Sequence, residues 1–115
     1  MKNLELAQHP NTPPETLRSL ATDDDSDVRY WVARNPNTPP ETLRSLATDD
    51  SAYVRYGVAE NPNTPEDLLR TLATDEYSTI RRYAAHNPNA TEIVRRLYLM
   101  TEAQTSAQTV TADLP

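Results

Sequence analysis

The sequence PNTPPETLRSLATDD occupies residues 10–24, and the same letters return unchanged at residues 36–50. Residues 62–76 carry an altered copy, PNTPEDLLRTLATDE. The prolines that open these copies, and a fourth at Pro88, are 26 residues apart with no insertion between them. A fixed period of about 20–50 residues is typical of chains that stack structurally equivalent units. The sequence therefore predicts a solenoid with full repeats at about 10–35, 36–61 and 62–87.

Helix signals divide each repeat into two helices. Thr12 and Glu15 have the spacing of a capping box, and proline suits the first helical position, so we expect a first helix over 13–21. The aspartates of the next corner can cap a second, shorter helix at about 25–33, which an Asn-Pro pair then ends. The period places further first helices at 39–47 and 65–73. Because the chain has a single glycine and no alternating apolar pattern, strands are not expected, and the predicted fold class is all-α.

Half-repeats flank the three full repeats. Residues 2–7 lie one period before a second helix, and residues 90–101 stand where another first helix belongs. Terminal repeats of a solenoid are commonly atypical because one side meets solvent, so we expect 90–101 to form a capping helix. The segment 102–115 is rich in Thr, Ala and Gln and has few apolar groups. The sequence therefore predicts one solenoid domain over 1–101, followed by a disordered polar tail over 102–115.

The composition limits the classes of function. The formal charge is −6, with 17 acidic and 11 basic residues, which favours basic partners over nucleic acid. The absence of cysteine excludes thiolate metal sites and cysteine nucleophiles. His9 and His86 lie three repeats apart, so they cannot form an acid–base or metal-binding pair in a rigid solenoid. We expect no enzyme, metal or cofactor, and, with no apolar stretch suited to a membrane span or signal peptide, a soluble cytoplasmic protein.

The unit NPNTPPETLRSLATDDSAYVRYGVAE at 35–60 resembles the leucine-rich repeat variant, a bacterial repeat. The shared elements are Asn-Pro, Thr-Pro, a Leu-x-x-Leu-Ala helix, an Asp corner and a Val-Arg pair, and the resemblance extends from residue 2 to about residue 100. It implies pairs of an α-helix and a shorter, often 3₁₀, helix wound into a right-handed superhelix, similar in architecture to HEAT repeats. Some members carry a cysteine-bound iron–sulfur cluster beside the repeats, a property that a chain without cysteine cannot share.

Each repeat also carries an arginine six residues after an aspartate. We interpret these residues as a structural ladder, in which each guanidinium group bonds a corner carboxylate or a helix-end carbonyl of a neighbouring repeat. A row of guanidinium groups for phosphate is the alternative. The ladder pairs are Asp23 with Arg29, Asp49 with Arg55, and Asp75 with Arg81.

Positions at which the copies differ cluster on the second helix and the corner before it. Because the demands of the scaffold act alike on every repeat, these positions are available for recognition, and Trp, Tyr and Arg are common in interface hot spots. Drift on a tolerant surface is the alternative. The leading hypothesis is a non-catalytic scaffold that binds a protein partner carrying basic and apolar groups. The predicted partner-binding residues are Asp24, Asp25, Asp27, Trp31, Arg34, Tyr53, Tyr77 and Tyr83.

Two other functions are compatible with the sequence. An arginine row on the first helices could bind nucleic acid, although Glu15 and Glu41 lie where they could pair with its first two members. The row consists of Arg18, Arg44, Arg70 and Arg96. Alternatively, the solenoid could self-assemble through apolar residues at its ends, or act as an inhibitor that blocks another protein. The end residues concerned are Leu4, Leu6, Leu97 and Tyr98.

Overall fold

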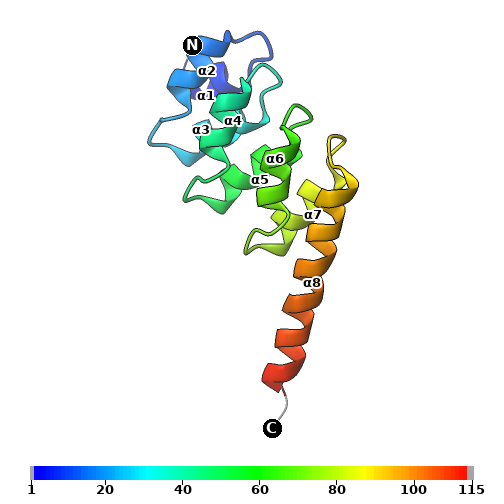
Figure 1. The fold of residues 1–115 in the computed structure, drawn as a ribbon. Coiled ribbons are helices and arrows are strands. Elements are labelled where there is room, and N and C mark those ends of the chain that lie inside the picture. The colour runs from blue at the N-terminus through cyan, green and yellow to red at the C-terminus, as the bar shows by residue number, and fades with distance from the viewer. Residues whose placement is uncertain (1, 114–115) are drawn as a thin grey trace.

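The structure is a computed structural model, and it describes the backbone of residues 2–113 and the side chains of residues 2–106. Within these residues the chain forms eight α-helices and no strand, stacked into an elongated body of 57 × 29 × 16 Å (Figure 1). The helices are α1 (Asn3–Gln8), α2 (Pro14–Leu20), α3 (Ser26–Arg34), α4 (Pro40–Leu46), α5 (Ala52–Glu60), α6 (Glu66–Leu72), α7 (Ser78–His86) and α8 (Glu92–Asp113). The predicted all-α solenoid is confirmed.

The helices form two layers that follow the repeat. The second helices α1, α3, α5 and α7 pack against one another in sequence, and α2, α4 and α6 lie beside them as the first helices. Helix α8 takes the place of a fourth first helix and packs against α6 and α7. Each helix is therefore positioned mainly by the repeats next to it, as expected for a solenoid.

The relative lengths of the two helices differ from the prediction. Each first helix has seven residues and each complete second helix has nine, and the described helices are all α rather than 3₁₀. The first helix is short because Pro13 and its equivalents act as the extended residue before the helix instead of its first turn. The second helix runs without interruption until the residue before the Asn-Pro pair, where proline disfavours the helical conformation.

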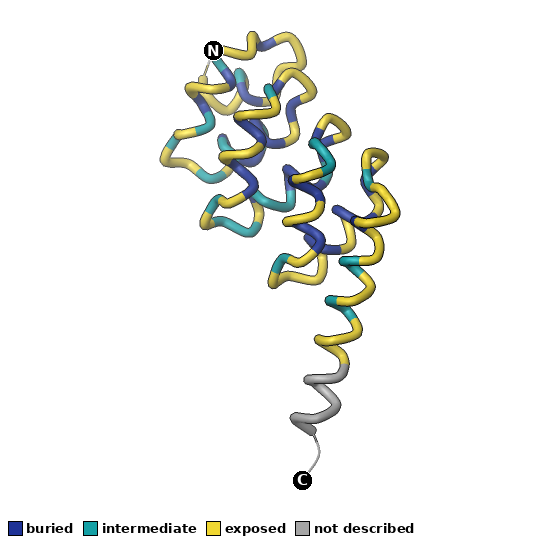
Figure 2. Tube along the Cα trace, viewed as in Figure 1, coloured by how far each residue is buried: buried dark blue, intermediate teal, exposed yellow. Residues whose placement is uncertain are grey.

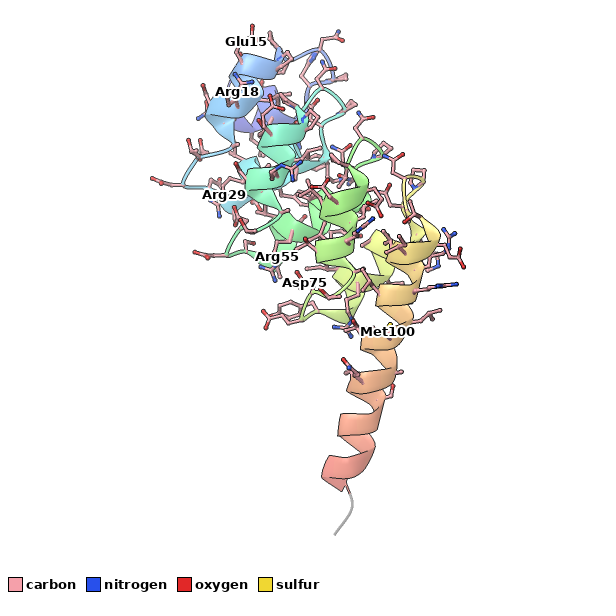
Figure 3. All side chains as sticks on the ribbon, in the orientation of Figure 1. Glu15, Arg18, Arg29, Arg55, Asp75 and Met100 are labelled. Carbon is pink, nitrogen blue, oxygen red and sulfur yellow. The ribbon has the colours of Figure 1, made fainter. Side chains whose placement is uncertain are left out.

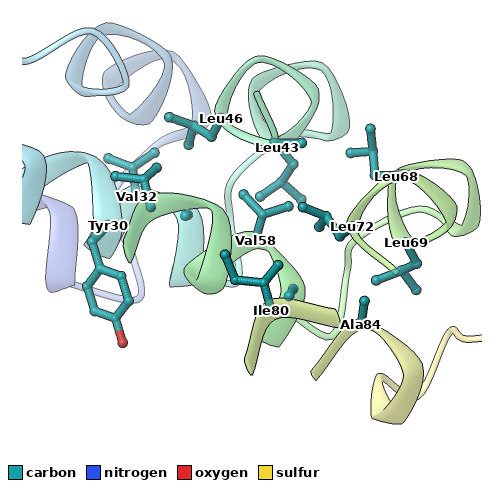
Figure 4. Packing of buried hydrophobic residues seen from close by; sticks show 14 of the residues in the cluster. Tyr30, Val32, Leu43, Leu46, Val58, Leu68, Leu69, Leu72, Ile80 and Ala84 are labelled. Carbon is teal, nitrogen blue, oxygen red and sulfur yellow. The ribbon is translucent and has the colours of Figure 1, made fainter. Parts of the chain in front are cut away.

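The hydrophobic core lies between the two layers. Leu17, Leu43 and Leu69 occupy the same position in successive repeats and are fully buried. In Figure 4 the leucines of α4 and α6 face Val58 and Ile80 of the second helices, while the ring of Tyr30 points away from them. Burying one such leucine contributes about 1.5–3 kcal/mol. Figure 2 shows that the buried positions alternate with exposed ones along every repeat, so the core is a continuous but thin layer.

The predicted capping box does not form. The Thr12 hydroxyl donates to the carbonyl of Leu6, and the equivalents Thr38 and Thr64 donate to Val32 and Val58 in the same way. None of the first helices α2, α4 and α6 has a side-chain hydrogen bond at its N-cap. These threonines are buried against the preceding second helix, so their hydroxyls satisfy its terminal carbonyls, which have no partner within that helix. The threonine therefore ends one helix rather than beginning the next.

Helix α8 extends beyond the predicted capping helix. The sequence predicts an end at residue 101, but the helix continues to Asp113, so residues 102–113 are helical where disorder is expected. No glycine or proline lies between Ala90 and residue 114 to stop the helix. Glu102, in the first turn past the predicted boundary, accepts a hydrogen bond from Arg81 at 2.7 Å. Residues 114–115, the end of the predicted tail, lie outside the described residues.

Candidate binding surface

The arginine–aspartate ladder joins each repeat to the next along one edge of the molecule (Figure 3). Arg29 donates from Nε and Nη2 to the two carboxylate oxygens of Asp49, at 2.9 and 3.2 Å, and from Nη1 to the carbonyl of Asp23 at 2.7 Å. Arg55 makes the equivalent bonds to the Asp75 carboxylate and to the Asp49 carbonyl. The carboxylate thus comes from the following repeat and the carbonyl from the arginine's own corner. The hydrogen bonds to these carboxylates raise the pKa of both arginines.

At both ends of the ladder, a different residue type takes the place of the arginine or the aspartate. Asn3 occupies the position equivalent to Arg29 and donates to the Asp23 carboxylate at 2.8 Å. The N–H of Asp25 and then Asn3 lower the pKa of that carboxyl. Arg81 donates to the carbonyl of Asp75, and Glu102 takes the place of the carboxylate of a further repeat. The ladder is therefore internally satisfied, with no exposed row of guanidinium groups for phosphate.

The arginine row on the first helices is also paired. Arg18 lies 3.6 Å from Glu41 of the next repeat, and Arg44 bonds Asp67 in the equivalent way. Arg70 and Arg96 pair with Glu66 and Glu92 of their own helices. The expected pairing of Arg18 with Glu15 is not the one that forms. Exposed pairs of this kind are weak, but a phosphate backbone would have to displace a carboxylate at each arginine of the row.

Most of the predicted partner-binding positions share one face of the second helices. In α3 they are Asp27, Trp31 and Arg34, and Tyr30 completes the i, i+3, i+4, i+7 spacing that places residues on one side of a helix. We call the surface formed by these positions in three repeats the variable face. It consists of Asp27, Tyr30, Trp31 and Arg34 on α3, Tyr53, Tyr56, Gly57 and Glu60 on α5, and Thr79, Arg82, Tyr83 and His86 on α7.

Aromatic rings join α3 to α5 within the variable face. Tyr30 stacks on Tyr53 with ring centroids 3.9 Å apart and meets Trp31 edge to face at 5.3 Å. The Arg34 guanidinium lies over both α3 rings, at 5.6 Å from the Trp31 centroid, and donates to the Tyr30 hydroxyl at 3.1 Å. The close approach of the two helices depends on Gly57, because a Cβ there would lie 3.0 Å from that of Ala33 and 3.1 Å from Tyr30. The result is a rigid aromatic cluster with an arginine at its border.

A second cluster joins α5 to α7. Tyr56 and Tyr83 meet edge to face with ring centroids 4.9 Å apart. The hydrogen bond with Tyr83, burial and the neighbouring Glu60 raise the pKa of Tyr56 above its ordinary value. Glu60 also lies 3.6 Å from Arg34 of the first cluster. The variable face is therefore a continuous strip across three repeats.

The remaining predicted residues lie at the corners, apart from this strip. Tyr77 precedes α7, and its ring contacts the Arg55 guanidinium of the ladder at 6.0 Å. The Asp25 carboxylate caps α3 by accepting from the N–H of Asp27. Asp24 is exposed and lines a polar hollow between the corners of the first two repeats. The structure thus brings together Asp27, Trp31, Arg34, Tyr53 and Tyr83 on one face, and places Asp24, Asp25 and Tyr77 elsewhere.

Sequence reasoning missed Tyr30 and Tyr56, which hold both aromatic clusters together. It selected positions that differ between repeats, and these tyrosines are identical in two copies. Their helical spacing relative to Trp31 and Arg34 was the signal that could have found them, since side chains three and four residues apart are neighbours on a helix. The varying residues therefore rest on a copied aromatic support.

None of the helices in the described part of the chain combines the length and the apolar character that a membrane span needs. Two family models match the chain. Residues 1–55 match the model described as Leucine Rich Repeat Variant domain, and residues 53–76 match a second model, described as Leucine rich repeat variant. No curated protein and no solved structure matches the chain. The two matched ranges overlap at residues 53–55 and together cover residues 1–76, which include the first two full repeats and part of the third. The chain belongs to the leucine-rich repeat variant family.

Proposed function

We propose that the protein is a non-catalytic scaffold that binds a protein partner through the variable face. The observation that carries the proposal is the pair of aromatic clusters, in which Tyr53 and Tyr83 remain 49% and 39% exposed while Tyr30 and Tyr56 support them from below. Exposed aromatic residues on rigid elements lose little conformational entropy on binding and offer a large contact area. Such residues, together with arginine, dominate the energy of many interfaces.

The charge of the surface suggests the chemistry of the partner. Asp27 lies on the first turn of α3 beside the first aromatic cluster, and the exposed Asp24 and Asp50 line the hollow between neighbouring corners. The chain carries a net charge of −6. A partner that contacts the first aromatic cluster and extends over the neighbouring corners would place apolar side chains on the rings and basic side chains opposite the carboxylates. The acids and arginines of the ladder take no part, because they bind one another.

A comparison of variants tests the proposal. The tagged chain is used to capture partners from its native host, in parallel with a Tyr53→Ala, Tyr83→Ala variant and an Arg18→Ala, Glu41→Ala variant that changes an exposed pair on the first helices. We expect partners that the wild-type and control chains enrich and the tyrosine variant does not. For the purified partner, calorimetry should give a loss of tenfold or more in affinity, about 1.4 kcal/mol, for the tyrosine variant.

Circular dichroism of all three chains establishes that each one folds. Partners that bind the tyrosine variant as tightly as the wild type would refute the variable face as the binding surface.

A further inference from the structure

A concave, positively charged surface lies where α7 meets the start of α8. One hollow is lined by Arg82, Tyr83 and His86, and a second by His86 and Arg95 together with Ala85, Tyr98 and Leu99. Because His86 lines both, the two hollows adjoin. We call this surface the α7–α8 groove. It begins at the C-terminal end of the variable face and continues onto the last helix.

The two arginines of this groove have no ion-pair partner among the described residues. Among the described residues, every arginine except Arg82 and Arg95 has a carboxylate within 4 Å. The Arg95 side chain donates only to the carbonyl of Ala90. Nδ1 of His86 contacts the carbonyl of Arg82 at 2.7 Å, and a carbonyl can only accept, so Nδ1 is the donor and His86 is held in place between the two hollows. Two arginines without an ion-pair partner therefore border the groove, and the acid that adjoins it, Glu60, lies 3.6 Å from Arg34 on the other side of the hollow that Glu60 lines with Tyr83 and His86.

These cations replace residues that the rest of the solenoid holds apolar or aromatic. Arg82 is equivalent to Tyr30 and Tyr56, and Arg95 is equivalent to Leu17, Leu43 and Leu69. Neither arginine supports the scaffold, because both are exposed and the other copies keep the fold without them. The groove also retains apolar contact area, since Leu99 is 63% exposed and Tyr83 39% exposed. Positive charge around an apolar floor suits a ligand with carboxylates on either side of an apolar side chain.

We propose that the α7–α8 groove binds an acidic peptide segment of the partner protein. Carboxylates lie opposite Arg82 and Arg95, because arginine can bind a carboxylate through two parallel hydrogen bonds. An apolar side chain of the segment packs between Tyr83 and Leu99. This inference rests on the proposed function and gives it a direction, because the exposed acids Asp24 and Asp27 lie near the start of α3, whereas the unpaired Arg82 lies on α7. The bound segment therefore presents basic groups to the first repeat and acidic groups to the last.

Peptide titrations followed by NMR test the inference on the full chain. The probes are three short peptides with a central phenylalanine, flanked by glutamates, by glutamines or by lysines. The glutamate peptide is expected to shift amide signals of α7 and of the start of α8, and the shifts should weaken with added salt. Arg82→Ala and Arg95→Ala should each lower its affinity about two- to fivefold, the range for one exposed charge pair. Arg18→Ala removes another exposed arginine, on α2, and should leave the affinity unchanged.

A charge-reversed chain, Arg82→Glu with Arg95→Glu, provides a test by gain of binding. It should bind the lysine peptide in preference to the glutamate peptide, and its dispersed NMR spectrum shows that it folds. The inference is overturned if the glutamate peptide does not bind, binds no better than the glutamine peptide, or binds the double alanine variant as tightly as the wild type.

The two proposals can fail separately. If the glutamate peptide does not bind but the captured partner still depends on Tyr53 and Tyr83, the proposed function stands and only the groove assignment fails. If peptide binding depends on Arg82 but capture does not depend on the tyrosines, the groove assignment stands and the variable face is not the binding surface.

Discussion

Asn61 shows how a single side chain holds two repeats together. It is 1% exposed, and its Nδ2 donates to the carbonyls of Ala33 and Asn35 in the preceding repeat, at 2.7 and 3.1 Å. Its Oδ1 accepts from the N–H of Asn63. Only an amide combines two donors with an acceptor in this way, so neither aspartate nor leucine can replace it. Asn35 and Asn87 make the same three contacts in their own repeats.

The asparagine at this position is therefore expected to be essential for stability. Asn61→Ala removes the side-chain partner of the Ala33 carbonyl and of the Asn63 N–H, and one of the two donors to the Asn35 carbonyl, so it should lower the free energy of unfolding by about 2–4 kcal/mol. Asn63→Ala is the matched control, because Asn63 is exposed and its side chain donates only to the carbonyl of Pro36. Its cost should be about 0.5–1.5 kcal/mol, measured by urea denaturation of both variants. Equal costs for the two variants would contradict this account of Asn61.

The role of Asn61 lay beyond what its neighbours in the sequence could indicate. The sequence placed it correctly before a proline at the end of a second helix, because that effect is local. Its hydrogen-bond partners lie 26 and 28 residues earlier, and only the stacking of repeats brings them together. The same limit explains the error at Thr38, whose capping-box spacing is local but whose hydroxyl bonds Val32 of the preceding helix. The residue types therefore predicted where the helices end. Which side chains bond the carbonyl groups at those ends depends on tertiary contacts.

At the scale of elements, the repeat predicted the helices better than their lengths. The period placed eight helical segments correctly because each copy repeats the same apolar positions and the same prolines. The lengths depended on which of two adjacent prolines enters the first helix, and the structure selects Pro14 and Pro40. For the variable face, the sequence identified Trp31, Tyr53 and Tyr83 by their variation. It also selected Tyr77, because variation alone does not distinguish a corner from a helix face.

Helix α8 is joined to α7 by a contact of the ladder as well as by apolar packing. Arg81 is 4% exposed, and its Nε donates to Glu102 at 2.7 Å. Thr101 holds the position equivalent to Asp75, so the sequence lacks the expected acid of the ladder, and the continuing helix supplies Glu102 one residue later. This contact joins the final helix to the second-helix layer.

Glu102→Ala should loosen the docking of α8. The variant leaves the buried Arg81 with only the Asp75 carbonyl as partner, at an expected cost of about 1–3 kcal/mol, and α8 amides should exchange with solvent faster than those of α5. Glu92→Ala is the control, because it removes an exposed partner of Arg96 on the same helix and should cost less than about 0.5 kcal/mol. Urea denaturation and hydrogen exchange measure both effects. If exchange in α8 is the same in the two variants, Glu102 does not anchor the helix.

On the scale of the whole molecule, the two ends of the solenoid carry charges where the interior carries apolar residues. Lys2 is equivalent to Val28, Val54 and Ile80, which are buried, and Arg95 is equivalent to three fully buried leucines. Both Lys2 and Arg95 are exposed. A second copy stacked head to tail, with the spacing of the repeats, would bury both cations, and desolvating an unpaired charge costs several kcal/mol. The residue that obstructs such stacking, Arg95, is also the one that keeps the α7–α8 groove open to a different partner.

The chain is therefore expected to be monomeric in spite of the exposed apolar side chains at its ends, such as Leu4 and Leu99. Replacing the two cations by the residues of the interior repeats, as in Lys2→Val with Arg95→Leu, should create complementary apolar ends and concentration-dependent head-to-tail oligomers. Light scattering and sedimentation over a hundredfold range of concentration measure this, with Lys2→Gln and Arg95→Gln as a control that removes charge but adds no apolar surface. A wild-type chain that oligomerises, or a Val/Leu variant that stays monomeric, would show that charge at the ends does not determine the assembly state. If the glutamine control also forms oligomers, the loss of charge alone explains the oligomerisation. If the glutamine control stays monomeric, stacking requires the restored apolar contact.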